Sequence, residues 1–293
     1  MSTFVEPVMQ ITTQDSDQLL RGIVIPPRPT IMLALQEAQQ GGDPEPSDIA
    51  ALISQDVSLS AAMLKTVNSP FFGLPQRVSS VPHAVILLGV RNAIRLASDL
   101  ALRNALKCDG HYHVERFWDM ATLDAQVTAF LAVQLNLPVR DQAYTFGLFQ
   151  NCGIPLLLAR FKDYQDTLDL AYASRNKPFT TIEMDRHGTH HAVIGYLVAR
   201  CWFLPESIGQ AILTHHDGTV FTEPSSEITD EVRTLVALAK LGEQISHGFL
   251  HLPRDQEWPT IGRAVLDHLH LSHDEYEDLC DAIQQMLERQ GQE

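Results

Sequence analysis

Apolar residues recur along this chain at the spacing of an α-helix. Ile31, Leu35 and Ala38, for example, fall on one side of a helix over residues 30–40, and similar stripes follow through the sequence. No long segment alternates with a period of two, as a half-buried strand would. The pattern therefore predicts an all-α protein with many helices and short connections. The expected helices cover residues 30–40, 48–55, 59–67, 82–88, 90–106, 117–135, 141–149, 154–161, 164–175, 181–187, 189–202, 205–216, 230–247, 260–268 and 272–290.

Capping residues and helix breakers set several of these boundaries. Ser47 has the chemistry of an N-cap for the second expected helix. Ser272, with Glu275 three residues later, forms a capping-box pattern at the start of the last one. Gly89 interrupts an apolar run, so the residues on its two sides are expected to form separate helices.

The composition is that of a globular protein with a large core. Of its 293 residues, 45% are hydrophobic and 19% are charged. The formal net charge is −15, and no run of Lys and Arg offsets the 36 acidic residues. Direct binding to a nucleic-acid backbone is therefore not expected.

The cysteines and the N-terminus point to a reducing compartment. The cysteines are far apart, lack a C-x-x-C pair, and are expected to be buried free thiols. The N-terminal sequence has no basic and apolar signal-peptide pattern. The longest apolar run of the chain, about the length of residues 84–90, is too short for a membrane span. The sequence therefore predicts a soluble cytoplasmic protein. The four cysteines are Cys108, Cys152, Cys201 and Cys280.

Residues 145–158, TFGLFQNCGIPLLL, form the most unusual stretch, because two adjacent amides, Gln150 and Asn151, end an apolar helix. Amide side chains donate and accept hydrogen bonds, but they do not titrate near neutral pH. A buried, hydrogen-bonded role is therefore expected for the pair. An acid–base or metal-ligating role is not.

Five histidines are grouped in two short segments. His187, His190 and His191 lie within one segment, and His215 and His216 end a predicted helix. One interpretation gives each histidine a structural role, with a backbone hydrogen bond or with the last pair as cations at a helix C-terminus. The other brings them into one pocket as metal ligands. The glycine after His187 argues against one continuous helix, and no H-E-x-x-H motif is present.

Other candidates have both a structural and a functional interpretation. Glu183 could orient the His191 ring, as carboxylates commonly do, or be a solvated acid in the first turn of a helix. Trp118 and Trp202 are expected in the core rather than as ligand platforms. Residues 68–73, NSPFFG, could present polar groups to a ligand or simply end a helix over packed aromatic rings.

Several motifs occur in the order found in the HDOD domain, which the chain resembles. The first half of the resemblance is carried by IPPRP at 25–29, DVSLSAAMLKTVNSPFFG at 56–73 and VSSVPHAVILLGVRNAIRL at 78–96. The second half is carried by Trp118, GLFQNCG at 147–153, Glu183, GTHHAVIG at 188–195, WFLP at 202–205 and AILTHH at 211–216.

The resemblance implies a division of the chain. Residues 1–20 are expected to be a flexible lead-in. The HDOD domain would span 21–220, with an N-terminal helical half at 21–110 and an HD-like half at 111–220. Residues 221–293 would then form a helical extension.

HDOD domains are relatives of the HD metal-dependent phosphohydrolases, so the resemblance implies an HD-like fold. The metal-binding His-Asp pair of the hydrolases matches Gln150 and Asn151 here, their earlier histidine falls near Met120, and their late aspartate falls at Lys240. The resemblance thus implies a degenerate pocket that keeps three imidazoles and has lost its carboxylates. The expected residues of this pocket are Gln150, Asn151, Glu183, His191, His215, His216 and Lys240.

Hard cations such as Mg²⁺ prefer carboxylate oxygen, so this implied pocket is not expected to hold one. The resemblance implies a non-catalytic bacterial signalling or regulatory module that needs no cofactor. Such a module would act through a signalling protein or a small-molecule ligand, with no nucleic acid or membrane as partner. The alternative is a metal-dependent phosphohydrolase in which His191, His215 and His216 hold a transition metal.

Overall fold

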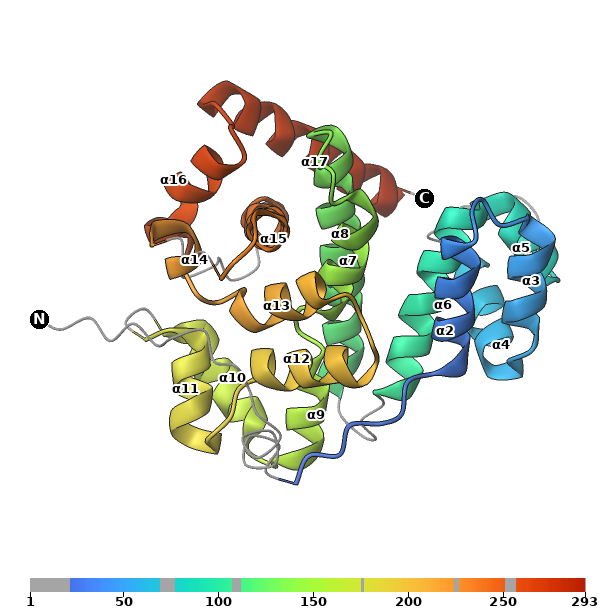
Figure 1. Ribbon diagram of the computed structural model, residues 1–293, viewed down its shortest axis with the longest axis horizontal. Coiled ribbons are helices and arrows are strands. Elements are labelled where there is room, and N and C mark those ends of the chain that lie inside the picture. The colour runs from blue at the N-terminus through green and yellow to red at the C-terminus, as the bar shows by residue number, and fades with distance from the viewer. Residues whose placement is uncertain are drawn as a thin grey trace, which may run out of the picture. The chain divides into compact units, whose positions relative to one another are not determined.

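A computed structural model describes residues 22–68, 77–106, 112–174, 177–223, 227–250 and 257–292. The regular structure of these residues is entirely helical, which confirms the predicted all-α class (Figure 1). The expected N-terminal lead-in, Cys108 and the NSPFFG segment beyond Asn68 lie outside the described residues. No helix in these ranges is long and apolar enough to cross a membrane.

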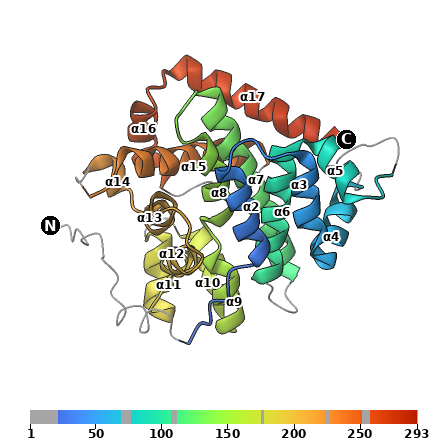
Figure 2. The same ribbon diagram turned by 45° about the vertical axis from the view of Figure 1, so that its right-hand side comes forward.

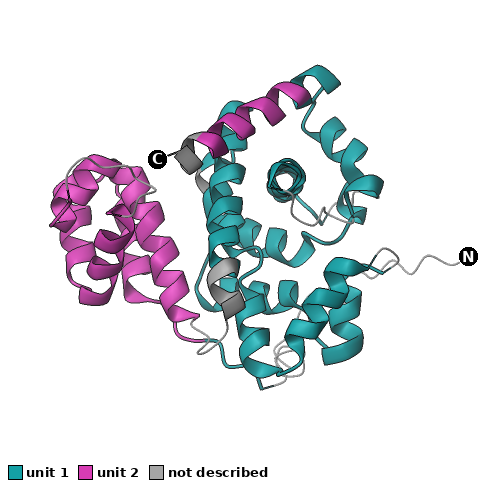
Figure 3. Cartoon of the chain, turned by 180° about the vertical axis from the view of Figure 1, so that it is seen from behind, with its two compact units in different colours: residues 1–25, 108–276 teal, residues 26–107, 277–293 magenta. Residues whose placement is uncertain are grey.

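The chain divides into two compact units (Figure 3). The smaller unit comprises residues 26–107 and 277–293. Its core is a cluster of buried aliphatic side chains, including Leu35, Ile49 and Met63. Its helices are α2 (Thr30–Gln40), α3 (Pro46–Ser54), α4 (Val57–Val67), α5 (Val81–Leu88), α6 (Val90–Ala105) and the part of α17 (His273–Gln292) from Glu277 onward.

Asn68 ends α4 and holds the described segment that leads into α5. Its amide nitrogen donates to the carbonyl oxygens of Leu64 and Val78, and its side-chain oxygen accepts from the Val78 backbone N–H at 2.7 Å. This bonding gives Asn68 the structural, helix-ending role that was one of its two interpretations.

The larger unit comprises residues 1–25 and 108–276. In it α7 and α8 lie side by side, α12 packs against both α9 and α13, and α15 packs against α7, α13 and α16 (Figures 1 and 2). Its helices are α7 (Tyr112–Gln134), α8 (Arg140–Phe149), α9 (Gly153–Arg160), α10 (Tyr164–Ala173), α11 (Phe179–His187), α12 (His191–Cys201), α13 (Glu206–Thr214), α14 (Thr219–Thr222), α15 (Asp230–Phe249) and α16 (Trp258–His268).

Two glycines in the central stretch allow close helix packing. A Cβ atom on Gly147 would lie 2.7 Å from the Ala125 Cα atom, so this glycine lets α8 approach α7. A Cβ atom on Gly153 would lie 2.2 Å from the backbone oxygen of His191, so this glycine lets α9 approach the start of α12. Both contacts position polar residues of the site described below.

The helix ends show which local signals decide a boundary. Ser272 and Glu275 form the predicted capping box, and Gly89 has φ 73° where α5 gives way to α6. Ser47 is not an N-cap, because α3 begins at Pro46, with Glu45 as its cap. Proline is favoured in the first helical turn, where its missing N–H group would have no partner in any case.

Two other expectations were wrong. No helix was expected between residues 216 and 230, but the short helix α14 lies there. Cys201 was expected to be buried, but it is exposed, whereas Cys152 is buried and Cys280 is half-buried. Cys201 is the last residue of α12, and the helical stripe of that segment did not reveal that its end faces outward.

Candidate functional site

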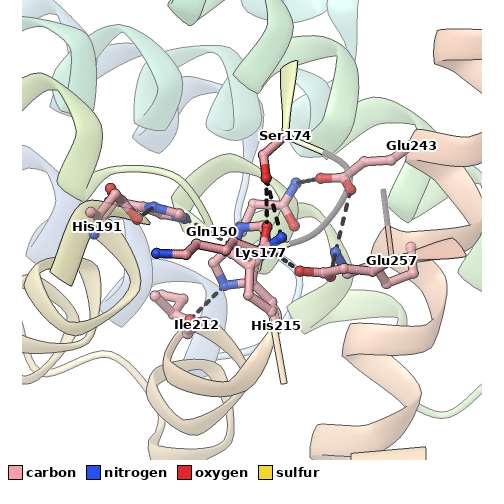
Figure 4. A network of polar contacts seen from close by, with 11 residues as sticks. Gln150, Ser174, Lys177, His191, Ile212, His215, Glu243 and Glu257 are labelled. Carbon is pink, nitrogen blue, oxygen red and sulfur yellow. Dashed lines mark hydrogen bonds and ion pairs between the residues drawn. The ribbon is translucent and has the colours of Figure 1, made fainter. Parts of the chain in front are cut away.

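Polar and charged side chains converge inside the larger unit, among otherwise apolar helices. They come from α7, α10, α11, α12 and α15, from the residues that directly follow α8 and α13, and from the residue before α16. Figure 4 shows part of this network. We call this set the central network. Its members are Asp124, Gln150, Tyr164, Glu183, His191, His215, His216, Lys240, Glu243 and Glu257.

Gln150 lies at the C-terminal end of α8 and joins two carboxylates. Its side chain is buried, and its Nε2 atom donates to Asp124 Oδ2 at 3.3 Å and to Glu243 Oε1 at 3.2 Å. Burial raises the pKa of Asp124 well above its usual range, and the nearby Glu243 charge adds to this effect. The Gln150 amide therefore takes a bridging position between two acidic groups.

Lys240 carries the positive charge of this half of the network. Its side chain is only 2% exposed, and its ammonium group bonds to Glu257 and lies 3.9 Å from Glu243 Oε2. A buried ammonium group is stable only when carboxylates compensate its charge. Lys240 thus links α15 to the start of α16 through Glu257.

His191 begins α12 and is held by Glu183 on α11. Its Nδ1 atom lies 2.7 Å from Glu183 Oε2, and its backbone N–H donates to Glu183 Oε1 at 3.2 Å. The hydroxyl of Tyr164 also donates to this carboxylate. Burial, reinforced by the Glu183 charge, raises the pKa of Tyr164 well above its usual range, so the phenol remains a donor.

His215 and His216 follow α13 and complete a group of three imidazoles. His215 Nε2 lies 3.3 Å from His191 Nε2, and its Nδ1 atom lies 2.6 Å from the Ile212 carbonyl oxygen. His216 Nδ1 lies 2.8 Å from Glu257 Oε1. One potential ligand atom from each of the three rings lies within 4.8 Å of the others. We call these three residues the histidine trio.

The environment of the last two imidazoles disfavours their protonated form. Burial lowers the pKa of His215 well below its usual range, and the neighbouring His216 contributes. Burial also lowers the pKa of His216, and Lys240 adds to the shift. His215 occupies the expected C-cap position, but the lowered pKa values disfavour the interpretation of this pair as cations there.

An aromatic ring lies against the trio. Phe179 stacks on His216 with the ring planes 16° apart, and it meets His191 edge to face with ring centroids 5.2 Å apart. The His191 ring is fully buried, and the side chain of His216 is 15% exposed. Access for a bulky molecule from this side is therefore restricted.

The structure brings most of the predicted pocket residues together. Gln150, Glu183, Lys240 and the trio all belong to the central network, and the expected contact of Glu183 with His191 is present. Asn151 is half-buried, and its backbone oxygen accepts from the Ile154 N–H.

The other singled-out histidines have separate positions. Gly188 ends α11 in the left-handed conformation, so the expected break between His187 and His191 is confirmed. His187 bonds instead to Thr167 through Nε2 at 2.8 Å. Trp118 and Trp202 are buried in the core, as expected.

Sequence reasoning missed three carboxylates of the network, Asp124, Glu243 and Glu257. The carboxylates that the hydrolase pattern would place at Asn151 and Lys240 are absent, but these three others belong to the network. Asp124 could have been suspected as an acid within an apolar stripe of α7, and Glu243 as a partner three residues after Lys240. No local signal marks Glu257, which lies 41 residues beyond His216.

An open hollow of about 570 Å³ lies on α10, α11 and the described ends of the segment between them. Its lining includes Ser174 and Lys177, which bond to each other and are drawn in Figure 4. None of its lining residues belongs to the central network.

Comparison with known proteins gives one family. The HDOD domain model matches residues 25–218. An uncharacterised protein of Treponema pallidum is 31% identical over 198 residues, which are 66% of this chain and 38% of that protein. The chain therefore spans less than two fifths of the length of this relative.

Solved structures share the fold. An HDOD domain protein of unknown function from Geobacter sulfurreducens has a TM-score of 0.69 at 20% identity and covers 94% of this chain and 95% of its own. A candidate phosphohydrolase from Shewanella amazonensis has a TM-score of 0.66 at 19% identity and covers 94% of each chain. A candidate signal transduction protein from Marinobacter aquaeolei has a TM-score of 0.69 at 23% identity and covers 93% of this chain and 61% of its own.

Proposed function

The chain belongs to the HDOD domain family, and from this premise we propose that it is a non-catalytic regulatory module. It would act by binding a signalling protein or a small ligand in the cytoplasm of a bacterium. The family is related to HD phosphohydrolases and to signal transduction proteins. The question for this chain is therefore which of these two roles its site can support.

The observation that carries the proposal is that the protein's own donors bind the carboxylates of the site. Gln150 donates to Asp124 and Glu243, and the Lys240 ammonium group bonds to Glu257. A hard cation such as Mg²⁺ needs several free oxygen ligands, and it would have to displace a buried ammonium group from this position. The arrangement thus favours a stable internal network over a metal-dependent phosphate site.

The burial of the site supports the same proposal. A phosphate ester must approach the catalytic groups closely, since hydrolysis requires the reacting atoms about 3 Å apart. His191 is fully buried and Phe179 lies against the trio, so such an approach requires these elements to move. The net charge of −15 also disfavours a nucleic acid as partner.

The test is a hydrolysis assay on the purified chain with a chromogenic phosphodiester and a phosphomonoester. Each reaction is run with Mg²⁺, Mn²⁺, Zn²⁺ and Fe²⁺ and compared with His191→Gln as the matched control. We expect turnover at the same background level in both proteins. Turnover that exceeds background and disappears in H191Q would refute the non-catalytic proposal.

A second candidate function, metal-dependent phosphohydrolysis, is favoured by one observation. The three imidazoles of the trio converge, and a metal held by three histidines can lower the pKa of a bound water to generate hydroxide. In this case turnover would need Zn²⁺ or a similar ion rather than Mg²⁺. It would be lost in both His191→Gln and His215→Gln.

A further inference from the structure

The hydrogen bonds of the histidine trio determine which nitrogen of each ring carries a proton. The three Nδ1 atoms face a Glu183 carboxylate oxygen, the Ile212 carbonyl oxygen and a Glu257 carboxylate oxygen. A backbone carbonyl only accepts. Glu183 already accepts from the Tyr164 hydroxyl and from a backbone N–H, as an ionised carboxylate does. Each Nδ1 atom is therefore the donor, which leaves a lone pair on each neutral Nε2 atom.

This assignment creates a conflict at the centre of the trio. His191 Nε2 and His215 Nε2 lie 3.3 Å apart and would face each other with two lone pairs. The conflict is resolved either by one extra proton between the two nitrogens or by a cation that both nitrogens bind.

The distances fit a cation. In a tetrahedral zinc site with Zn–N bonds of about 2.0–2.1 Å, two nitrogen ligands lie about 3.3–3.4 Å apart. The observed Nε2–Nε2 distance is 3.3 Å, and all three potential ligand atoms lie within 4.8 Å of one another.

The partners of the Nδ1 atoms also match those of metal-binding histidines. Such histidines usually donate their second ring N–H group to a carboxylate or a backbone carbonyl, which fixes the ring and raises its basicity. Here His191 and His216 have carboxylate partners and His215 has a carbonyl partner. A core of unrelated structural histidines would not be expected to repeat this arrangement three times.

The charges around the trio are compatible with a divalent ion. Lys240 places one ammonium group near it, and this charge opposes a metal. The carboxylates of Glu183, Glu243 and Glu257 lie in the same network, so the acidic groups outnumber the ammonium group. Glu257 bonds to both Lys240 and His216 and therefore lies between the ammonium group and the ring.

We infer that His191, His215 and His216 together bind one transition-metal ion of the zinc or ferrous class. Imidazole nitrogen suits these ions, whereas Mg²⁺ and Ca²⁺ prefer oxygen. The ion would be the small ligand of the regulatory module. That the ion has no catalytic role rests on the proposed function. Ion binding itself does not depend on that function.

The experiment measures binding to the full chain after removal of metal with a chelator. Zn²⁺ affinity is determined by competition with a chromophoric chelator, Co²⁺ binding by visible absorption, and stoichiometry by elemental analysis. The variants are His216→Gln and Glu257→Gln, whose wild-type side chains are both partly exposed, and the control is His83→Gln on the exposed face of α5. Circular dichroism confirms that each variant is folded.

We expect about one ion per chain in the wild type and in H83Q. Affinity should fall at least tenfold in H216Q, because a ligand is lost, and by about 10–100-fold in E257Q, because the ring loses its orienting carboxylate. The absence of stoichiometric binding to the folded wild type would overturn the inference. Equal binding by wild type and H216Q would also overturn it.

The same samples separate this inference from the proposed function. Binding without turnover supports both. Binding with turnover that His191→Gln abolishes keeps the metal site and refutes the non-catalytic role. If neither binding nor turnover is found, only the metal site is refuted.

Discussion

Replacing Lys240 with Met tests whether the central network is held together by its internal charges. The ammonium group bonds to Glu257 and lies 3.9 Å from Glu243, and the Lys240 side chain is 2% exposed. Removing one partner of a fully buried pair typically costs about 3–5 kcal/mol, because the other charge remains buried without compensation. The two glutamates are 15% and 16% exposed. Some water reaches them, so we expect K240M to lower the free energy of unfolding by about 2–4 kcal/mol.

Urea unfolding followed by tryptophan fluorescence measures this change, with a chelator present throughout. Trp118, Trp202 and Trp258, the three tryptophans of the chain, all lie in the larger unit, so the signal reports on the unit that holds the network. The double variant with Glu257→Gln should be less destabilised than the sum of the single variants, by about 1–3 kcal/mol, because the unpaired carboxylate is gone.

The control for this experiment is Arg263→Met, which breaks the ion pair of Arg263 with Asp267 on the surface of α16. The two side chains are 87% and 58% exposed, and such pairs contribute only about 0.3–0.5 kcal/mol. If K240M costs no more than R263M, or if the double variant is simply additive, the charges do not hold the network together and our reasoning fails.

Three further predictions follow from the same contacts. Burial and Glu243 raise the pKa of Asp124, so the folded state keeps a proton that the unfolded state releases. The free energy of unfolding of the wild type should therefore fall by up to about 1.4 kcal/mol per pH unit as the pH rises above the ordinary aspartate range. Asp124→Asn should lack this decline in urea unfolding between pH 5 and 8, and parallel pH profiles of the two proteins would contradict the assignment. Gly153→Ala should destabilise the larger unit by several kcal/mol in thermal unfolding, since its Cβ would lie 2.2 Å from the His191 backbone oxygen. In the control Gly248→Ala the added Cβ meets nothing within 4 Å, so this variant should gain up to about 1 kcal/mol of stability. Similar melting temperatures of the two variants would argue against close packing at Gly153. Tyr164→Phe should cost about 1–3 kcal/mol, because the buried Glu183 loses a donor, and an unchanged unfolding midpoint would show that this bond is not formed.

The helices and their order could be predicted from the sequence, because each depends on a local apolar stripe. Boundaries were less predictable where two signals compete. The serine at 47 is a favoured N-cap residue, but Pro46, which is favoured in the first helical turn, determines the start of α3. Short elements such as α14 carry too few residues for a periodic pattern. The local information is therefore enough for the class and most elements, and it is insufficient for their ends.

The candidate site was only partly predictable, for a different reason. Glu183 and His191 are eight residues apart and meet across the turn at Gly188, so their contact could be inferred from neighbouring segments. Gln150 meets Asp124 across 26 residues and Glu243 across 93. Such partners are chosen by the packing of α7, α8 and α15, which the sequence pattern of any single helix does not contain.

The matched domain ends at residue 218, yet Lys240, Glu243 and Glu257 all lie beyond it. The histidine trio lies wholly within the matched segment, whereas the charged groups that act on His216, Lys240 and Glu257, come from outside that segment. Two proteins could therefore share the segment, including its histidines, and still present different charges to them. Changes in α15 or before α16 would retune metal affinity or ligand choice without altering a residue by which the family is recognised.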